Sequence, residues 1–314
     1  MFIDSIGHYI PKQLIPNDYF KDVNGLSDEW IFSRTGIKTR TKASETETTN
    51  SMGIEAVKDA VQNISFDIEK VDLVIGASYT PYDTIGTLAH DIQREFNLED
   101  AKAIYISSAC SSLINAIEIV EGYFASGKSE YALVVASEHN TAYSNESDKK
   151  SGHLWGDGAA AIFISKNKSK ENQPEIKDIY TKGLGHIGKS VDAIYLHPTN
   201  GGLLMPFGKD VFVHACNYMI EALEIILDRN KITINDLDYL IPHQANVRII
   251  DHIAHSVKIS KDKILTNIRE LGNTGCASTL IALSQNIEKI KPTSKIGLTV
   301  FGGGYSCGSM LINF

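Results

Sequence analysis

The sequence predicts an α/β protein made of two related halves. Residues 71–78 and 237–243 are short apolar runs that each follow a helical pattern, and residues 131–136 and 295–301 form a second corresponding pair. These runs are continuous rather than alternating, which is typical of strands buried between helical layers. Corresponding landmarks lie about 165 residues apart along the chain. We therefore expect a duplicated α/β unit.

The boundary between the halves is predicted in the polar stretch 167–174. Residues 1–166 would then form the N-terminal half and residues 175–314 the C-terminal half. A chain of 314 residues exceeds one average domain and can bury a large core.

The composition narrows the class of protein. A hydrophobic fraction of 43% with 22% charged residues is typical of globular proteins. No apolar run approaches the roughly 18–20 residues of a membrane span. The four cysteines form no C-x-x-C pair, which favours a reducing compartment. The net charge of −8 argues against a general nucleic-acid binder. We expect a cytoplasmic protein without membrane insertion.

Cys110 lies where an apolar strand pattern turns into a helix. Residues 103–110 read A-I-Y-I-S-S-A-C, and apolar residues recur at helical spacing after them at Leu113, Ile114, Ile117 and Val120. A thiol at a helix start faces unpaired backbone N–H groups and the positive end of the helix dipole, which favours the thiolate. This setting indicates a nucleophile, with a buried structural cysteine as the alternative.

Two polar residues occupy turns in the second half. His243 follows an apolar strand and precedes a helical pattern, and Asn273 lies in a glycine-flanked turn that opens another helix. A glycine run at 302–304 follows a further strand. Taken singly, each feature has a structural explanation in turn geometry or close backbone packing. Together with Cys110 they match the pattern of an activated thiol with two polar helpers.

These segments resemble β-ketoacyl-[acyl carrier protein] synthase III, a condensing-enzyme family of the thiolase superfamily. The resemblance includes S-D-E-W-I-F-S-R-T-G-I at 27–37 and W-G-D-G-A-A at 155–160, and it covers essentially the whole chain. It implies the thiolase-like five-layered α-β-α-β-α fold with two pseudo-symmetric halves. The active site is then expected where the strand ends of both halves meet.

The resemblance also implies an acyltransferase that catalyses a decarboxylative Claisen condensation. Cys110 would take an acyl group from a thioester primer, and malonyl-acyl carrier protein would lose carbon dioxide and give a 3-oxoacyl product. His243 and Asn273 would stabilise the enolate, while the backbone N–H groups of Cys110 and Gly303 would form the oxyanion hole. We expect no metal and no cofactor beyond the coenzyme A or phosphopantetheine thioesters that serve as substrates.

The same resemblance assigns residues to substrate delivery. Trp30 and Arg34 match positions that bind the nucleotide end of coenzyme A. Positions expected to contact the substrate farther along the chain are Gly208, Phe212 and Asn246, the last in the pantetheine tunnel. Arg248 matches the carrier docking surface, where positive charge is expected from Lys258, Lys261 and Lys263.

Three positions depart from the family pattern. Lys149 stands where the family has a stacking arginine, and Lys209 stands where it has asparagine. Because lysine lacks a planar guanidinium, we expect a weaker preference for a coenzyme A primer, with an acyl-carrier primer as the alternative. Ile85 replaces the phenylalanine of a Phe-Pro pair, which predicts an altered primer preference near the junction of a homodimer. A secondary-metabolite pathway is compatible with this departure.

Other functions share parts of the pattern. A hydroxymethylglutaryl-CoA synthase would need a glutamate before the cysteine, and residues 78–92 contain none. A thiolase would need a second cysteine within the glycine loop, which Cys307 only follows. A non-condensing acyl-carrier-binding subunit would not need the full cysteine, histidine and asparagine set. His252 and His255 are spaced as metal ligands can be, but no ligand cluster surrounds them in sequence.

Overall fold

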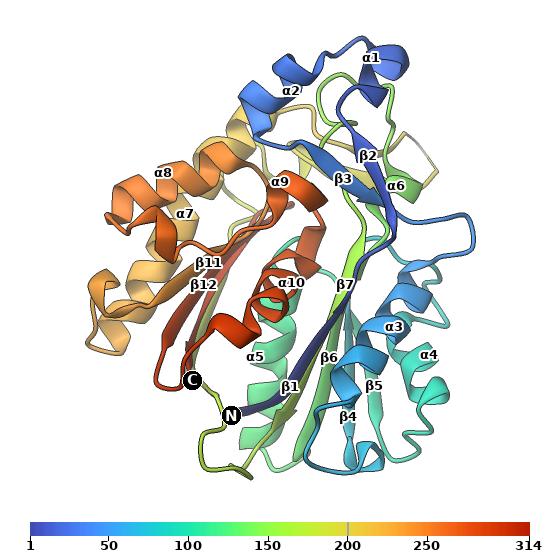
Figure 1. Cartoon of the computed structure of the whole chain (residues 1–314). Coiled ribbons are helices and arrows are strands. Elements are labelled where there is room, and N and C mark those ends of the chain that lie inside the picture. Colours follow the sequence, from blue (N-terminus) through green and yellow to red (C-terminus); the bar gives the residue numbers. More distant parts are fainter. Residues whose placement is uncertain (200) are drawn as a thin grey trace.

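One large mixed sheet forms the centre of the molecule in this computed structural model, which describes residues 1–199 and 201–314 (Figure 1). The strand order is β11-β12-β13-β8-β1-β7-β6-β4-β5. The strands of this sheet are β1 (Phe2–Tyr9), β4 (Leu73–Ala77), β5 (Lys102–Ile106), β6 (Tyr131–Glu138), β7 (Gly158–Ser165), β8 (Glu175–Gly183), β11 (Tyr239–Pro242), β12 (Lys295–Gly302) and β13 (Ser306–Asn313). Two small sheets pair β2 (Gln13–Pro16) with β3 (Thr39–Lys42), and β9 (Tyr195–His197) with β10 (Gly202–Leu204).

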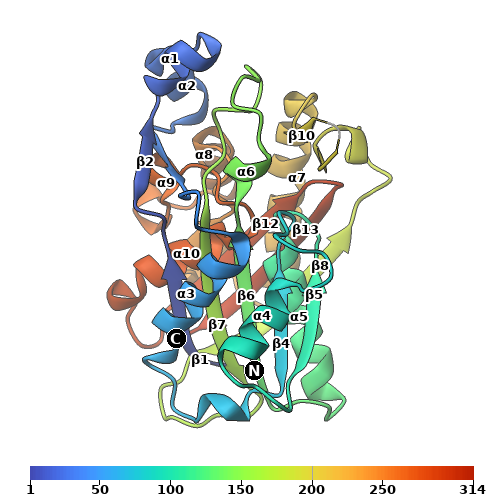
Figure 2. The same cartoon turned by 90° about the vertical axis from the view of Figure 1, so that its right-hand side faces the viewer.

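The helices are α1 (Tyr19–Asn24), α2 (Asp28–Thr35), α3 (Thr49–Val61), α4 (Leu88–Glu95), α5 (Ser112–Ala125), α6 (Asn140–Tyr143), α7 (Gly208–Arg229), α8 (Val247–Val257), α9 (Ile268–Leu271) and α10 (Ser278–Gln285). Three pairs of them form layers around this sheet, namely α3 with α4, α5 with α10 and α7 with α8. Helices α3 and α4 cover the outer face of the N-terminal part of the sheet, and α7 and α8 cover that of the C-terminal part (Figures 1 and 2). Helices α5 and α10 lie between the two parts.

This arrangement confirms the predicted five layers. The middle hydrophobic cluster contains side chains of α5 and α10 together with strands of both halves. Separate outer clusters lie beneath α3 and α4 and beneath α7 and α8. Burial of apolar surface on both faces of the sheet explains why the strand sequences are continuous apolar runs.

The duplication is visible in strand order and direction. The series β1-β7-β6-β4-β5 corresponds to β8-β13-β12-β11, and each matched neighbour pair has the same parallel or antiparallel direction. The counterpart of β5 is shortened to a single parallel bridge between Leu240 and Ile264. The two halves belong to one continuous sheet, because β1 of the first half pairs with β8 of the second half at Phe2 and Glu175. The domain boundary at 167–174 stays a prediction.

Across the described residues, no helix combines the length and apolar character needed to cross a membrane.

Candidate active site

Cys110 lies in a strained turn between β5 and α5. The preceding residue, Ala109, has a φ of +48°, which a non-glycine residue rarely adopts. Ser112 holds the turn, since its hydroxyl accepts a hydrogen bond from the Ser108 N–H (2.8 Å) and donates one to the Ala109 carbonyl (2.6 Å). The Cys110 side chain is 6% exposed. The turn thus presents the thiol inside the protein, where the two halves meet.

The glycine loop of the second half approaches this turn closely. A Cβ atom on Gly302 would lie 2.5 Å from the Ser108 carbonyl oxygen and 3.0 Å from the Cys110 nitrogen, so a larger residue does not fit there. The backbone N–H groups of Cys110 and Gly303 both act to lower the pKa of the Cys110 thiol. Since Gly303 also lines the same cavity as Cys110, one backbone N–H from each half is available near the thiol.

The expected thiolate is not the resting state of this site. Burial raises the pKa of Cys110 to about 12, and the negative charge of Glu138 adds to that increase. The hydroxyl of Tyr79 and the two backbone N–H groups oppose it. The sequence-based expectation was wrong because loss of solvation outweighs the helix-start effect for a thiol this deeply buried.

His243 follows β11 and is held by one side-chain contact. Its Nδ1 lies 2.8 Å from the Ser278 hydroxyl oxygen, at the start of α10. Fixing Nδ1 in this way orients the ring so that Nε2 is the free nitrogen. Burial lowers the pKa of His243 to about 4. The ring is therefore neutral at physiological pH.

Asn273 is fixed through its backbone and its side-chain oxygen. Its N–H donates to the Leu154 carbonyl (2.9 Å) and its carbonyl accepts from the Gly156 N–H (3.0 Å). Its Oδ1 accepts from the Gly275 N–H (3.0 Å). With the oxygen occupied in this turn, the amide NH2 is the group left to donate elsewhere.

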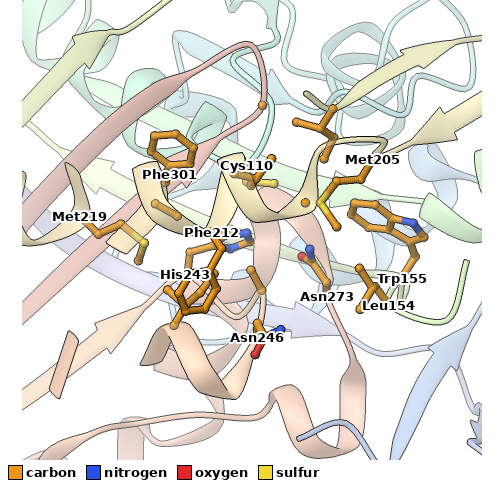
Figure 3. Close-up of a pocket in the computed structure, with 17 residues that line it drawn as sticks. Cys110, Leu154, Trp155, Met205, Phe212, Met219, His243, Asn246, Asn273 and Phe301 are labelled. Carbon is orange, nitrogen blue, oxygen red and sulfur yellow. The ribbon is translucent and has the colours of Figure 1, made fainter. Parts of the chain in front are cut away.

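One cavity brings these groups together, as Figure 3 shows. The predicted residues that line it are Cys110, Gly208, Phe212, His243, Asn246, Asn273 and Gly303. Apolar side chains form most of the remaining wall, among them Leu154, Trp155, Met205, Met219 and Phe301. Concave, largely apolar sites with a few converging polar groups are typical of binding sites for small ligands.

The other predicted substrate residues lie outside the cavity lining. The Arg34 guanidinium carbon lies 4.3 Å from the centre of the Trp30 ring, so the two predicted coenzyme A residues contact each other on α2. Lys149 lies in an exposed loop next to Gly25, on the same part of the surface. Lys209 is exposed at the start of α7.

The residues predicted for carrier docking are partly engaged within the protein. The Arg248 guanidinium donates to the Ser33 carbonyl (2.8 Å) while remaining exposed. The neighbouring Asn246, predicted for the pantetheine tunnel, donates its amide to the Arg34 carbonyl (3.2 Å). Lys261 pairs with Asp251 at 2.6 Å, and Lys263 donates to the Leu237 carbonyl at 2.6 Å. Because Asp251 offsets the charge of Lys261 and Lys263 is half-buried, the exposed Arg248 and Lys258 are the stronger contributors to positive charge.

Sequence reasoning missed a buried carboxylate close to Cys110. Glu138, at the end of β6, accepts hydrogen bonds from the hydroxyls of Ser78 (3.0 Å) and Thr80 (2.5 Å). Burial raises its pKa to about 7. Tyr79 was missed as well; its hydroxyl donates to the Asn140 Oδ1 (2.7 Å). The sequence signal that could have identified Glu138 is its position as a charged residue at the end of an apolar strand.

Within residues 1–199 and 201–314, no group of three or more histidine, cysteine or acidic side chains is arranged to hold a metal ion.

The site defines a condensing enzyme of the thiolase-like class, because a thiol, a neutral imidazole, a carboxamide and two backbone donors surround one cavity.

Comparisons with known proteins agree with this class. Residues 105–183 match the family model of 3-oxoacyl-[acyl-carrier-protein (ACP)] synthase III, and residues 227–314 match that of its C-terminal part. The β-ketoacyl-[acyl-carrier-protein] synthase III of Clostridium novyi (strain NT) is 32% identical, covering 99% of this chain and 98% of that protein. The corresponding protein of Aquifex aeolicus is 33% identical, covering 98% and 97%.

Solved structures give the same result. The crystal structure of 3-oxoacyl-[acyl-carrier-protein] synthase III from Aquifex aeolicus matches with a TM-score of 0.92 at 32% identity, covering 100% of this chain and 99% of that one. The priming β-ketosynthase of the R1128 polyketide biosynthetic pathway matches with a TM-score of 0.91 at 26% identity, covering 100% and 96%.

The chain belongs to the β-ketoacyl-[acyl-carrier-protein] synthase III family. It is a condensing, acyl-transferring enzyme that initiates fatty-acid or related biosynthesis. The family resemblance, the thiolase-like fold and this function are confirmed predictions. The roles of individual site residues remain predictions.

Proposed function

We propose that the enzyme is an acyltransferase that joins an acyl thioester primer to malonyl-acyl carrier protein through a Cys110 acyl-enzyme. The observation that carries this proposal is the convergence of Cys110, His243 and Asn273 on one cavity, which Gly303 also lines. No cofactor takes part beyond the substrate thioesters.

The first half-reaction transfers the acyl group. The Cys110 sulfur attacks the thioester carbonyl, the carbon–sulfur bond to the first carrier breaks, and the thiol proton ends on the departing carrier sulfur. The backbone N–H groups of Cys110 and Gly303 stabilise the tetrahedral oxyanion. Because the resting thiol is protonated, proton removal is coupled to the attack and does not precede it.

The second half-reaction forms the carbon–carbon bond. The malonyl thioester loses carbon dioxide, and the enolate oxygen that forms accepts hydrogen bonds from His243 Nε2–H and the Asn273 amide. The contact between Ser278 Oγ and His243 Nδ1 supports this role, because in the tautomer with the proton on Nε2 the Ser278 hydroxyl is the donor to Nδ1. The enolate carbon then attacks the acyl carbonyl carbon on Cys110, and the bond from that carbon to the Cys110 sulfur breaks as the 3-oxoacyl product leaves. The sulfur takes up one proton from solvent, which regenerates the thiol.

The residues at the predicted substrate positions are compatible with two primer carriers. A coenzyme A primer would use Trp30 and Arg34, with Arg34 leaving the ring face that it now covers. An acyl-carrier primer is favoured by Lys149, which cannot stack as arginine does, and by Lys209, which stands where the family has asparagine. Arg248 would contact the acidic carrier in either case.

We further propose a cytoplasmic homodimer. The edge strand β5 has half-buried apolar side chains, and Ile85 in the neighbouring loop is 87% exposed. An unpaired apolar edge of this kind is commonly covered by a second copy. A monomeric mass in sedimentation analysis at micromolar concentration would contradict this part.

The two half-reactions can be tested separately. Intact-mass analysis after incubation with a panel of acyl-CoA and acyl-carrier primers should show an adduct on the wild-type enzyme that Cys110→Ala lacks. His243→Ala and Asn273→Ala should still acquire some adduct but lose roughly 10²–10³ in malonyl decarboxylation rate. Decarboxylation at the wild-type rate in both variants would show that the assigned roles are wrong.

A further inference from the structure

The glycine loop that carries the Gly303 donor continues into a buried, strained tyrosine. Tyr305 has a φ of +30° and is 2% exposed. Its hydroxyl donates to Oδ1 of Asp210 at 2.6 Å. Its backbone carbonyl accepts from the Leu184 N–H at 2.8 Å. A bulky residue keeps such a backbone conformation only where its surroundings enforce it.

Asp210 connects this tyrosine to the wall of the cavity. It lies in the first turn of α7, between the cavity-lining residues Gly208 and Phe212. Its Oδ1 also accepts from the Lys189 N–H at 2.9 Å, and His214 Nε2 lies 3.7 Å away. The Tyr305 hydroxyl is the leading cause of a lowered Asp210 pKa, which keeps the carboxylate an ionised acceptor.

A second contact holds the same loop from the same side. Ser190 is also strained, with a φ of +42°, and its hydroxyl donates to the Gly304 carbonyl at 2.7 Å. Ser190 directly follows Lys189, so one short segment contacts both the glycine loop and Asp210. The loop is therefore held at Gly304 by the Ser190 hydroxyl and at Tyr305 by Asp210, with strained backbone at both Ser190 and Tyr305.

We propose that Tyr305 and Asp210 are positioning residues that hold the Gly303 N–H against the Cys110 sulfur and couple this donor to helix α7. This inference rests on the proposed function, because it assigns Gly303 to the oxyanion hole. The link has a functional consequence. A substrate chain that displaces Gly208 or Phe212 on α7 shifts Asp210, and through Tyr305 it shifts the oxyanion donor.

The proposal separates the two half-reactions. Gly303 serves the tetrahedral oxyanion, whereas the enolate donors His243 and Asn273 are held by Ser278 and Gly275, outside this network. Loss of the Tyr305 hydroxyl should therefore slow acyl transfer and spare decarboxylation. A general structural defect would slow both.

The test uses Tyr305→Phe, which keeps the ring and removes the hydroxyl, with Tyr218→Phe on α7 as the matched control. Acylation is followed by quenched intact-mass analysis. Decarboxylation of malonyl-acyl carrier protein is followed in a Cys110→Gln background, where the amide stands in for the acyl thioester. We expect Tyr305→Phe to lower kcat for acylation roughly tenfold or more. The KM of the primer and the decarboxylation rate should stay within twofold, and the control should match the wild type.

Asp210 variants keep the proposal falsifiable should Tyr305→Phe fold poorly. Asp210→Asn retains an acceptor for the hydroxyl and should recover most of the acylation rate, whereas Asp210→Ala should match Tyr305→Phe. The double variant Tyr305→Phe/Asp210→Ala should be no slower than either single one. Parallel loss of both half-reactions, or unchanged acylation, would overturn the inference. A wild-type enzyme that forms no adduct on Cys110 would instead overturn the proposed function.

Discussion

The two halves of the molecule place a cysteine in the same kind of turn and use it differently. Cys110 precedes α5 and lines the cavity, whereas Cys276 precedes α10 and is 1% exposed. The Cys276 thiol donates to the Ala77 carbonyl at 3.3 Å. One turn presents to the cavity the thiol that we propose as the nucleophile, and the other turn buries its thiol in the core. The duplicated backbone does not by itself create chemistry.

The residue that packs against each turn accounts for the difference. Gly302 ends β12 and lies against the Cys110 turn of the other half. Glu138 ends the corresponding strand β6 and lies against the second turn, where a Cβ atom on Gly275 would come within 2.7 Å of the Glu138 side chain. A glycine leaves room for backbone donors at the sulfur, while a glutamate fills the equivalent space with a buried carboxylate.

Exchange of each cysteine for alanine gives the largest expected effect. Cys110→Ala should lose acylation and condensation completely, because the bond-forming atom is gone. Cys276→Ala should keep acylation near the wild-type rate and lose about 1 kcal/mol of stability, since it removes a small buried group. Intact-mass analysis and thermal unfolding measure the two effects. Equal loss of acylation in both variants would contradict the different roles assigned to Cys110 and Cys276.

The next effect concerns the close approach at Gly302. Gly302→Ala should reduce acylation by roughly 10²–10³, because the added methyl group pushes the glycine loop and its Gly303 donor away from Cys110. Gly122→Ala on α5 is the matched control, since its added methyl group meets no atom within 4 Å. We would measure the acylation rates of the two variants and confirm their folding by circular dichroism. An active Gly302→Ala enzyme would show that the close approach is not needed.

Much of this comparison could be predicted from the sequence, because its signals are local. Cys110, His243 and Asn273 each lie at a strand-to-helix turn, and glycine or small residues mark such turns. Glu138, Ser278 and the pair of Asp210 with Tyr305 were not predicted as parts of the site. Their partners are separated by tens of residues or more along the chain, and only the folded structure brings them together. The pKa of Cys110 was mispredicted for the same reason, since burial is a property of the whole fold.

A smaller effect is expected from neutralising the buried carboxylate. Glu138→Gln keeps the shape and a hydrogen-bond acceptor but removes the charge that helps to raise the pKa of Cys110. The thiolate fraction at pH 9 should rise, and alkylation of Cys110 by iodoacetamide should become roughly three- to tenfold faster. Peptide mapping identifies the labelled cysteine, and Cys110→Ala supplies the background. Slower or unchanged labelling would mean that Glu138 does not act on the thiol through its charge.

The smallest expected effect concerns His243, which follows β11. Its neutral ring predicts a malonyl decarboxylation rate that hardly depends on pH. Burial lowers the pKa of His243 to about 4, so the ring stays neutral as the pH falls from 8 to 5.5. Glu138 titrates within this window, with a pKa raised to about 7, and would mask the result. In the Glu138→Gln enzyme, malonyl decarboxylation should therefore change less than twofold over this range. An inflection near pH 6.5, the ordinary pKa of histidine, would show that His243 is solvated in the working enzyme.

The pH dependence of protein stability provides an independent check on the pKa of His243, with a defined sign. Because the folded-state pKa is depressed, the contribution of His243 is complete above about pH 6.5 and is lost as the pH falls toward 4. Between pH 7 and 5, wild-type melting temperatures should therefore fall more steeply than those of His243→Gln.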